Sequence, residues 1–328
     1  MLISEPSFSL RLCGEISFYI LVIVPSTSQK ANRLLFVPGK NPKPPAEEHR
    51  RQLLRSLLRG VERADPAVAL EIEGKPDSFQ CISWNPLYYQ SYKPLDEDLP
   101  WIEALLKQAG PTQEDVQEAL SFRRRFAWVL YTVADLLHFL IPLLPDPAVR
   151  ATIRETARYF SNDGGIGQQV RELLKVPLRK MLEAGDRIII IGHSMGSVIA
   201  YDSLWELTHI EKNPGRVDLL SLGSPLGMRF TQQRLLGVRE KGTQRYPQNI
   251  RHWTNMTAQG DLTAPDPTVR DDFKAMLELG VVESITDVNG GLFNYFRNEK
   301  GLNAHRSYGY LVNPRVGEVI ARWWKEGG

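Results

Sequence analysis

The sequence predicts an α/β protein with a mostly parallel central sheet and helices on both faces. Short apolar runs typical of buried strands alternate along the chain with stretches of helical periodicity. One run, Ile188–Ile191, has four consecutive β-branched residues, which is typical of a central parallel strand buried on both faces. The 328 residues contain no internal repeat. We therefore expect one α/β domain that carries an insertion.

The first predicted elements are a strand, a helix and a second strand. Leu34–Val37 is a short apolar run that ends abruptly at a Pro-Gly pair. A helix is expected from Ala46 to a natural stop at Gly60. Its apolar residues repeat at helical spacing: Leu53, Leu54, Leu57 and Leu58. Phe79–Trp84 is the second expected strand.

The middle of the chain, from 96 to 185, has a predominantly helical pattern. Leu99–Ala109 and Thr112–Leu120 are expected to be short amphipathic helices, the second capped by its first threonine. Phe126–Leu144 is much more apolar. A further apolar stripe at helical spacing follows over 166–182, and Pro177 is expected to break it.

Strands and helices alternate again after the four isoleucines. A helix is expected over Met195–His209, and Val217–Leu222 and Ile250–Met256 are the next strands. Val281–Val288 is a weaker strand pattern, and Val316–Trp324 is a closing helix. This order divides the chain into an N-terminal extension or extra strand (1–30), a first part of the α/β core (31–95), a helical insertion or cap (96–185) and a second part of the core (186–328).

The composition excludes several classes of protein. Lys and Arg total 40 against 38 for Asp and Glu, and no long basic run suggests nucleic acid binding. The two cysteines, Cys13 and Cys81, leave no cysteine-based zinc site and disfavour a disulfide-built secreted domain. We expect no cofactor and no metal, and a cytoplasmic protein of unknown oligomeric state.

The apolar run over 16–24 leaves the N-terminus open to other interpretations. It is far shorter than the roughly 20 residues that a membrane-spanning helix needs. Its β-branched and aromatic residues suit a buried strand. A signal or anchor segment and a misassigned start codon remain the alternatives.

A serine at the sharp turn after the isoleucine strand is the predicted nucleophile. Gly192-His193-Ser194-Met195-Gly196 has the G-x-S-x-G pattern between a strand and a helix. Such a turn lifts the serine hydroxyl above the sheet, and the two glycines allow close contact with the neighbouring strand and helix. Ser194 is therefore expected to attack a substrate carbonyl.

A serine nucleophile needs a base and an acid, which in enzymes with this turn follow the serine in the order acid, then histidine. Of the later histidines, His209 lies on the helix after the turn and His252 within a predicted strand. His305, in a loop before the last helix, is the expected base.

Two aspartates are considered for the acid. Asp261, just after the strand Ile250–Met256, is the first choice, because a carboxylate at a strand end can reach the second nitrogen of a histidine. Asp287, near the end of a weaker strand, is the alternative. Backbone N–H groups of Met195 and of Gly39 or Lys40, after the first strand, are expected to form the oxyanion hole.

The turn and a later stretch resemble a known family. GHSMGSVIAYDSL and LGSPLGM are similar to stretches of intracellular DDHD-type phospholipases and related α/β-hydrolase esterases and lipases, and H-R-S-Y around the histidine resembles their histidine loop. The resemblance covers roughly 33–325 and implies the α/β-hydrolase fold and carboxylic-ester hydrolysis. Asp271-Asp272 stands alone, without the DDHD group's acidic and histidine cluster, so phospholipid specificity is not carried over.

Segment 126–144 bears on the substrate. An apolar cap there would favour a small-molecule ester or lipid with a hydrophobic acyl chain and peripheral contact with lipid surfaces. A helix pair buried in the core is the alternative, and a membrane span is disfavoured by Asp135. The other functions considered are a non-catalytic protein that binds a hydrophobic ligand, an acyltransferase and a peptidase.

Overall fold

A computed structural model of the chain describes residues 30–127, 129, 155–264 and 266–326. The apolar run 16–24 lies outside the described residues. So does segment 126–144, apart from Phe126, Ala127 and Val129. The predictions for these two segments therefore stay predictions.

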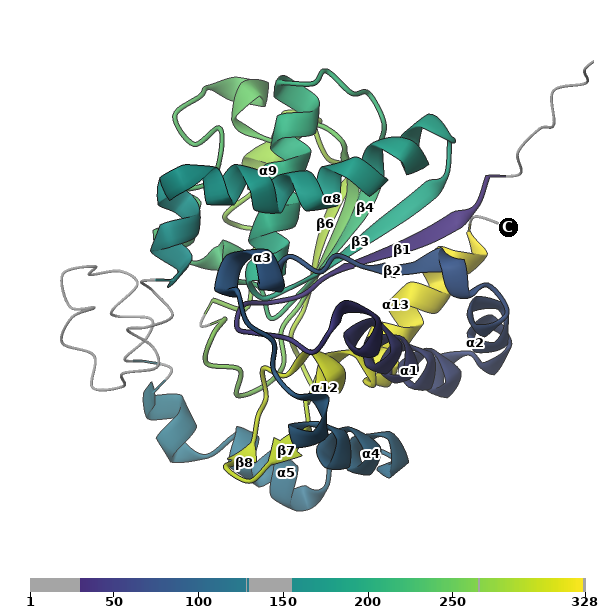
Figure 1. Ribbon diagram of the computed structural model, residues 1–328. Coiled ribbons are helices and arrows are strands. Elements are labelled where there is room, and N and C mark those ends of the chain that lie inside the picture. The colour runs from purple at the N-terminus through teal and green to yellow at the C-terminus, as the bar shows by residue number, and fades with distance from the viewer. Residues whose placement is uncertain (1–29, 128, 130–154, 265, 327–328) are drawn as a thin grey trace, which may run out of the picture.

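A six-stranded, fully parallel sheet forms the centre of the molecule, in the order β2-β1-β3-β4-β5-β6 (Figure 1). Its strands are β1 (Asn32–Val37), β2 (Phe79–Cys81), β3 (Arg187–His193), β4 (Val217–Leu222), β5 (Ile250–Met256) and β6 (Ser284–Val288). The predicted α/β class is confirmed. Because all strands are parallel, the loops that follow them meet at one edge of the sheet, where ligands bind in such folds.

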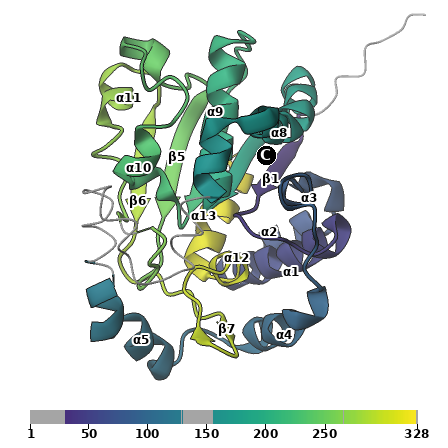
Figure 2. The ribbon, with the colours of Figure 1, turned by 60° about the vertical axis from the view of Figure 1, so that its left-hand side comes forward.

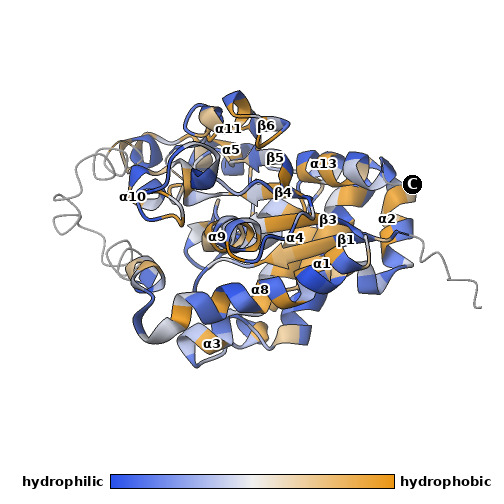
Figure 3. Cartoon of the chain, turned by 90° about the horizontal axis from the view of Figure 1, so that it is seen from above, coloured by the Kyte–Doolittle hydropathy of each residue, from blue (hydrophilic) through white to orange (hydrophobic). Residues whose placement is uncertain are grey.

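Long helices cover both faces of this sheet. On one face lie α8 (Ile166–Glu183) and α9 (Met195–His209), and on the other α1 (Ala46–Ala64), α2 (Pro66–Glu73) and α13 (Pro314–Lys325) (Figure 1). Seen from above, apolar residues concentrate in the strands, and the outer faces of the helices are largely hydrophilic (Figure 3). The fold is therefore a three-layer α/β arrangement.

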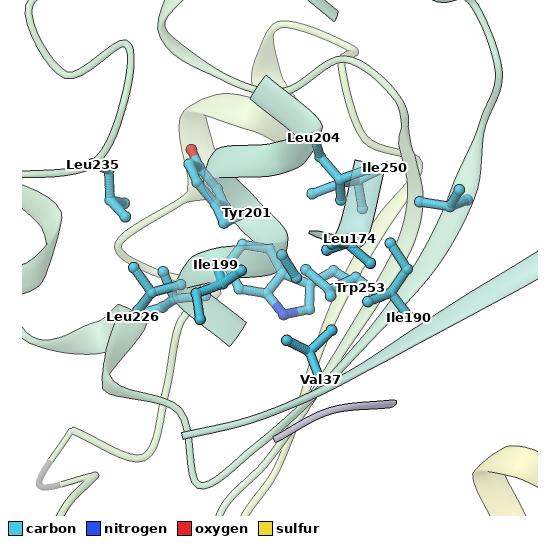
Figure 4. Packing of buried hydrophobic residues seen from close by; sticks show 14 of the residues in the cluster. Val37, Leu174, Ile190, Ile199, Tyr201, Leu204, Leu226, Leu235, Ile250 and Trp253 are labelled. Carbon is cyan, nitrogen blue, oxygen red and sulfur yellow. The ribbon is translucent and has the colours of Figure 1, made fainter. Parts of the chain in front are cut away.

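The four isoleucines of β3 contribute to both hydrophobic layers. Ile188 and Ile190 belong to the core under α8 and α9, and Ile189 and Ile191 to the core under α1 and α13. Each is at most 3% exposed. In the first layer, side chains from α9 and the strands pack around Trp253 (Figure 4). The β-branched run thus forms a central strand buried on both faces, as its composition predicts.

The described part of the chain also contains shorter elements. They are α3 (Asn85–Tyr89), α4 (Leu99–Lys107), α5 (Gln113–Ala119), α10 (Arg229–Gln232), α11 (Lys274–Glu278), α12 (Ser307–Leu311) and the hairpin of β7 (Arg297–Asn298) and β8 (Gly301–Leu302). The hairpin lies beside α4 and α5 (Figure 2), where Arg297 Nε donates to Asp115 at 2.6 Å. Thr112 caps α5 as predicted, through a hydrogen bond with Asp115 N.

Two predicted helix breaks are wrong. α1 continues past Gly60 to Ala64, because Gly60 is a point of close helix packing and not a stop: a Cβ there would lie 2.1 Å from Leu311 O. α8 runs through Pro177 without interruption. Packing of these helices on the sheet outweighs the local preference of a single residue.

The second strand is shorter than predicted. β2 ends at Cys81, and Trp84 precedes the short helix α3. The Trp84 indole N–H donates to Pro38 O at 2.8 Å, which draws this residue toward the loop after β1. β6 likewise begins at Ser284 and not at Val281.

A buried polar network joins α8 to α9. Asp202 on α9 accepts hydrogen bonds from Tyr159 Oη at 3.0 Å and Leu236 N at 2.9 Å. Nearby, Arg171 on α8 donates to Glu206 at 2.8 Å. Burial raises the pKa of Asp202 to about 7, although the surrounding donors act in the opposite direction.

This pKa predicts a pH-dependent stability. Between about pH 4 and 7 the folded chain retains the Asp202 proton that the unfolded chain releases, so this group lowers the free energy of unfolding as pH rises. Asp202→Asn removes the effect. Urea unfolding at pH 5 and pH 8 measures the free energy of unfolding of both proteins. The difference between the variant and wild type should shift in favour of the variant by roughly 1–4 kcal/mol from pH 5 to pH 8. An equal difference at both pH values would contradict the assignment.

Candidate active site

Ser194 occupies a strained turn between β3 and α9. Its backbone has φ 53° and ψ −126°, which a residue with a side chain rarely adopts. The flanking glycines make the turn sterically possible: a Cβ at Gly192 would lie 2.6 Å from Ser197 Cα, and one at Gly196 would lie 2.0 Å from Val37 O. The turn has the geometry that the G-x-S-x-G pattern predicts.

Hydrogen bonds hold this turn to its neighbours. Ser194 N donates to Leu222 O at 2.9 Å, which ties the turn to the end of β4. Ser197 Oγ donates to Ser194 O at 2.6 Å and contacts Ser224 Oγ at 2.6 Å. Ser197 and Ser224 were not among the predicted site residues. Their positions after β3 and β4 are the only sequence signal that points to them.

The structure brings His305 and Asp261 into direct contact. His305 Nδ1 lies 2.8 Å from Asp261 Oδ2, and because a carboxylate only accepts, the imidazole donates from Nδ1. Asp261 is 3% exposed and follows β5, whereas His305 precedes α12. Among the hydrogen bonds of the described residues, none joins Ser194 Oγ to His305. Such bonds are often long without a ligand.

The carboxylate of Asp261 is held in its charged form. Burial alone would raise its pKa, but the charge and hydrogen bond of His305, with hydrogen bonds from Tyr310 and Thr263, lower the pKa to about 2. Thr263 Oγ1 donates to Asp261 Oδ1 at 2.7 Å, and Thr263 N donates to the same oxygen at 3.0 Å. Both oxygens of Asp261 are thus occupied by donors.

Asp287, the alternative acid, lies elsewhere in the hydrogen-bond network. Its Oδ1 accepts from Val269 N at 3.0 Å and Asn255 Nδ2 at 2.9 Å, and its Oδ2 accepts from Arg270 N at 3.0 Å. These bonds attach the loop after β5 to β6. Of the two aspartates considered, Asp261 is the one that contacts His305.

His193 connects the turn to the histidine loop. Its Nε2 donates to His305 O at 2.8 Å, and the centroids of the two imidazole rings lie 4.8 Å apart. Burial, with the neighbouring His305 and Lys43, lowers the pKa of His193 well below its usual value. A neutral side chain directly before Ser194 therefore holds the backbone of His305 beside the turn.

The loop after β1 lies against Ser194. A Cβ at Gly39 would lie 2.9 Å from both Ser194 Cβ and His193 Nδ1, so only glycine fits there. The buried Asn85 fixes this loop, because its Nδ2 donates to Gly39 O at 2.8 Å and to Asn41 O at 2.9 Å. Asn85 is a further residue that sequence reasoning missed.

The residues predicted to supply the oxyanion hole are Gly39 itself and the residues that directly follow Ser194 and Gly39 in the chain. Met195 is the first residue of α9, and N–H groups in the first turn of a helix have no partner within the helix. Lys40 follows Gly39, and its Nζ lies 3.9 Å from Glu155. Burial lowers the pKa of Lys40, while Glu155 acts in the opposite direction.

Two cavities adjoin the acid and the histidine. One of about 230 Å³ is lined by His305, Thr263 and the cationic Arg124 and Lys300. Another of about 410 Å³ adjoins Asp261 and is lined in part by Leu120, Leu262 and Ala264. Apolar and cationic side chains therefore face the space beside the candidate site.

Within the described residues, no group of three or more metal-ligating side chains comes together. No helix in the described part of the chain has the length and apolar character to cross a membrane.

Comparisons with family models, with curated proteins and with solved structures find no match to this chain.

Proposed function

We propose that this chain is a serine hydrolase of the α/β-hydrolase type that cleaves carboxylic esters. One observation carries the proposal: a strained serine turn lies at the same edge of the sheet as a histidine bonded to a buried aspartate. A protein that only binds a hydrophobic ligand needs no base aligned by a carboxylate. The predicted helical insertion before β3, residues 96–185, would then include the cap of such an enzyme.

In the proposed reaction Ser194 Oγ attacks the ester carbonyl while Nε2 of His305 accepts the hydroxyl proton. Asp261 keeps the imidazole proton on Nδ1 and stabilises the imidazolium. The N–H groups of Met195 and of Gly39 or Lys40 bind the oxyanion. His305 passes the proton to the leaving alcohol. Water, deprotonated by His305, then attacks the acyl-enzyme carbonyl. The bond between the acyl carbon and Ser194 Oγ breaks, His305 returns the proton to Oγ, and the free acid leaves.

The proposal of hydrophobic substrates draws on apolar side chains in the cavity beside Asp261, whose lining does not include Ser194. Leu120, Leu262 and Ala264 line the cavity next to Asp261. Phe122 is 83% exposed, and its ring stacks with that of Phe126, with 6.5 Å between the ring centroids. Exposed aromatic side chains next to arginines suit contact with a lipid surface. Arg124 lies between these two phenylalanines in the chain and donates to Gly260 O at 3.0 Å. This bond joins the stretch that carries the phenylalanines to the loop that carries Asp261.

The test is a series of nitrophenyl esters of increasing chain length. We expect turnover of all members and kcat/KM at least about tenfold higher for octanoate than for acetate, because each buried methylene contributes about 0.8 kcal/mol. Released nitrophenol is measured by absorbance. A preference for acetate would contradict the hydrophobic substrate, and no turnover above that of heat-denatured protein would contradict the proposed enzyme.

An acyltransferase would use the same residues and differ in its acceptor. Adding a primary alcohol to the same assay separates the two. Ester formed in place of free acid would assign the transfer reaction, and free acid as the product supports hydrolysis.

A further inference from the structure

Tyr310 contacts the candidate acid directly. Its hydroxyl donates to Asp261 Oδ2 at 2.6 Å, the same oxygen that accepts the His305 N–H. The tyrosine oxygen in turn accepts from Ala258 N at 2.9 Å. Tyr310 is fully buried on α12, and its direction is therefore fixed by bonds on both sides.

The neighbouring backbone leaves room for the junction, by which we mean the contact of Asp261 Oδ2 with the side chains of Tyr310 and His305. Gly223, in the loop after β4, has φ 52°. A Cβ there would lie 2.7 Å from Asp261 Oδ2, 2.9 Å from Tyr310 Oη and 3.1 Å from His305 Nδ1. A side chain at this position would thus occupy the point where the three polar groups meet.

Two donors on one carboxylate oxygen compete for it. The stronger the bond from Tyr310, the less negative charge Oδ2 offers to the imidazole. Burial and the charge of Asp261 raise the pKa of Tyr310 well above its usual value, so the phenol remains a donor over the working pH range.

We propose that Tyr310 is a positioning residue of the candidate site, which fixes Asp261 Oδ2 and moderates its hold on His305. The inference rests on the proposed function of the same residues. It assigns a role to α12, a helix that the sequence did not predict.

Other groups near the junction differ from Tyr310 in what they touch. His193 packs on the His305 ring from the end of β3, but it bonds the backbone and is neutral. Arg124 is bonded to Gly260 O and Leu302 O, and Arg306 is paired with Asp98. Thr263 bonds the opposite oxygen of Asp261 and also approaches His305 Nδ1. Tyr310 is the group that shares Oδ2 with the imidazole.

The test compares Tyr310→Phe with the matched control Tyr308→Phe. Tyr308 lies on the same helix, and its buried hydroxyl has no hydrogen-bond partner among the described residues. We expect Tyr310→Phe to lower kcat roughly tenfold with little change in KM, because Asp261 then loses the bond that fixes the direction of Oδ2. The acid limb of its pH–rate profile should move up by roughly half a pH unit or more, because Oδ2 then stabilises the imidazolium more strongly. Tyr308→Phe should change neither.

A second readout does not require turnover. The proton on His305 Nδ1 gives a downfield NMR signal, which should move further downfield in Tyr310→Phe and remain in place in Tyr308→Phe. If the chain proves not to hydrolyse esters, this signal still tests the role of Tyr310. An unmoved signal and an unmoved acid limb, with only a lower melting temperature, would overturn the proposal.

Tyr310→Phe leaves Ala258 N without its acceptor, which lowers stability. 3,5-Difluorotyrosine at position 310 avoids this loss, because it keeps the hydroxyl and makes it a stronger donor. The acid limb should then move to lower pH. Movement in the same direction as in Tyr310→Phe, or none, would overturn the proposal.

Discussion

Ser194→Ala should abolish labelling by a fluorophosphonate and lower kcat for ester hydrolysis by about 10⁴–10⁶-fold. The hydroxyl is the proposed nucleophile, and the turn at Ser194 is strained, as in strand-to-helix turns that present a serine hydroxyl above the sheet. Stability should change little or rise, because alanine removes no hydrogen bond that holds the turn: the bonds at this position are made by its backbone N–H and C=O. Labelling is measured on gels with a fluorescent probe.

Ser203→Ala is the matched control for this experiment. Ser203 lies on the same helix, α9, and its buried hydroxyl has no partner among the described residues. The control should be labelled at the wild-type rate. Labelling that persists in Ser194→Ala would show that another residue reacts, and the proposed nucleophile would be wrong.

Asp261→Asn should lower kcat by about 10⁴-fold. The amide nitrogen of asparagine donates and cannot accept the His305 N–H, so the imidazole loses the tautomer that leaves Nε2 free to accept the serine proton. KM should change much less than kcat. Initial rates with a nitrophenyl ester, together with circular dichroism to verify folding, measure the effect.

Asp287→Asn distinguishes the two aspartates. Asp287 accepts the N–H groups of Val269 and Arg270, so its substitution should cost about 1–3 kcal/mol of stability and leave kcat within tenfold of wild type. The reverse pattern, with a large kcat loss only in Asp287→Asn, would make Asp287 the acid. Comparing the two variants separates a loss of catalysis from a loss of folding.

Several elements could be predicted because local patterns carry them. Helix α9 and strands β4 and β5 have the predicted bounds. Their signals are local: a glycine-bounded turn before the helix, and short segments rich in β-branched, leucine and aromatic residues for the strands. Sequence reasoning failed where packing overrides local preference, as at Gly60, which allows α1 to approach α12 and α13 closely.

The candidate site shows the same division. The turn at Ser194 could be predicted from the G-x-S-x-G pattern together with the strand before it and the helix after it, because such a turn is a local structure. The pairing of His305 with Asp261 and not with Asp287 depends on the order of strands in the sheet and on the path of the chain from β6 to α12. The spacing of these residues along the sequence does not give the distance between their side chains in the fold.

The sequence by itself determined the α/β class, the central isoleucine strand and the sharp turn at Ser194, because each arises from the chemistry of neighbouring residues. Only the tertiary structure decided which acid meets the histidine and that Tyr310, Asn85 and His193 hold the surrounding groups in place. These contacts join residues that are far apart in the chain. They form only when the parallel strands bring their carboxyl ends to one edge, a result of packing the whole domain.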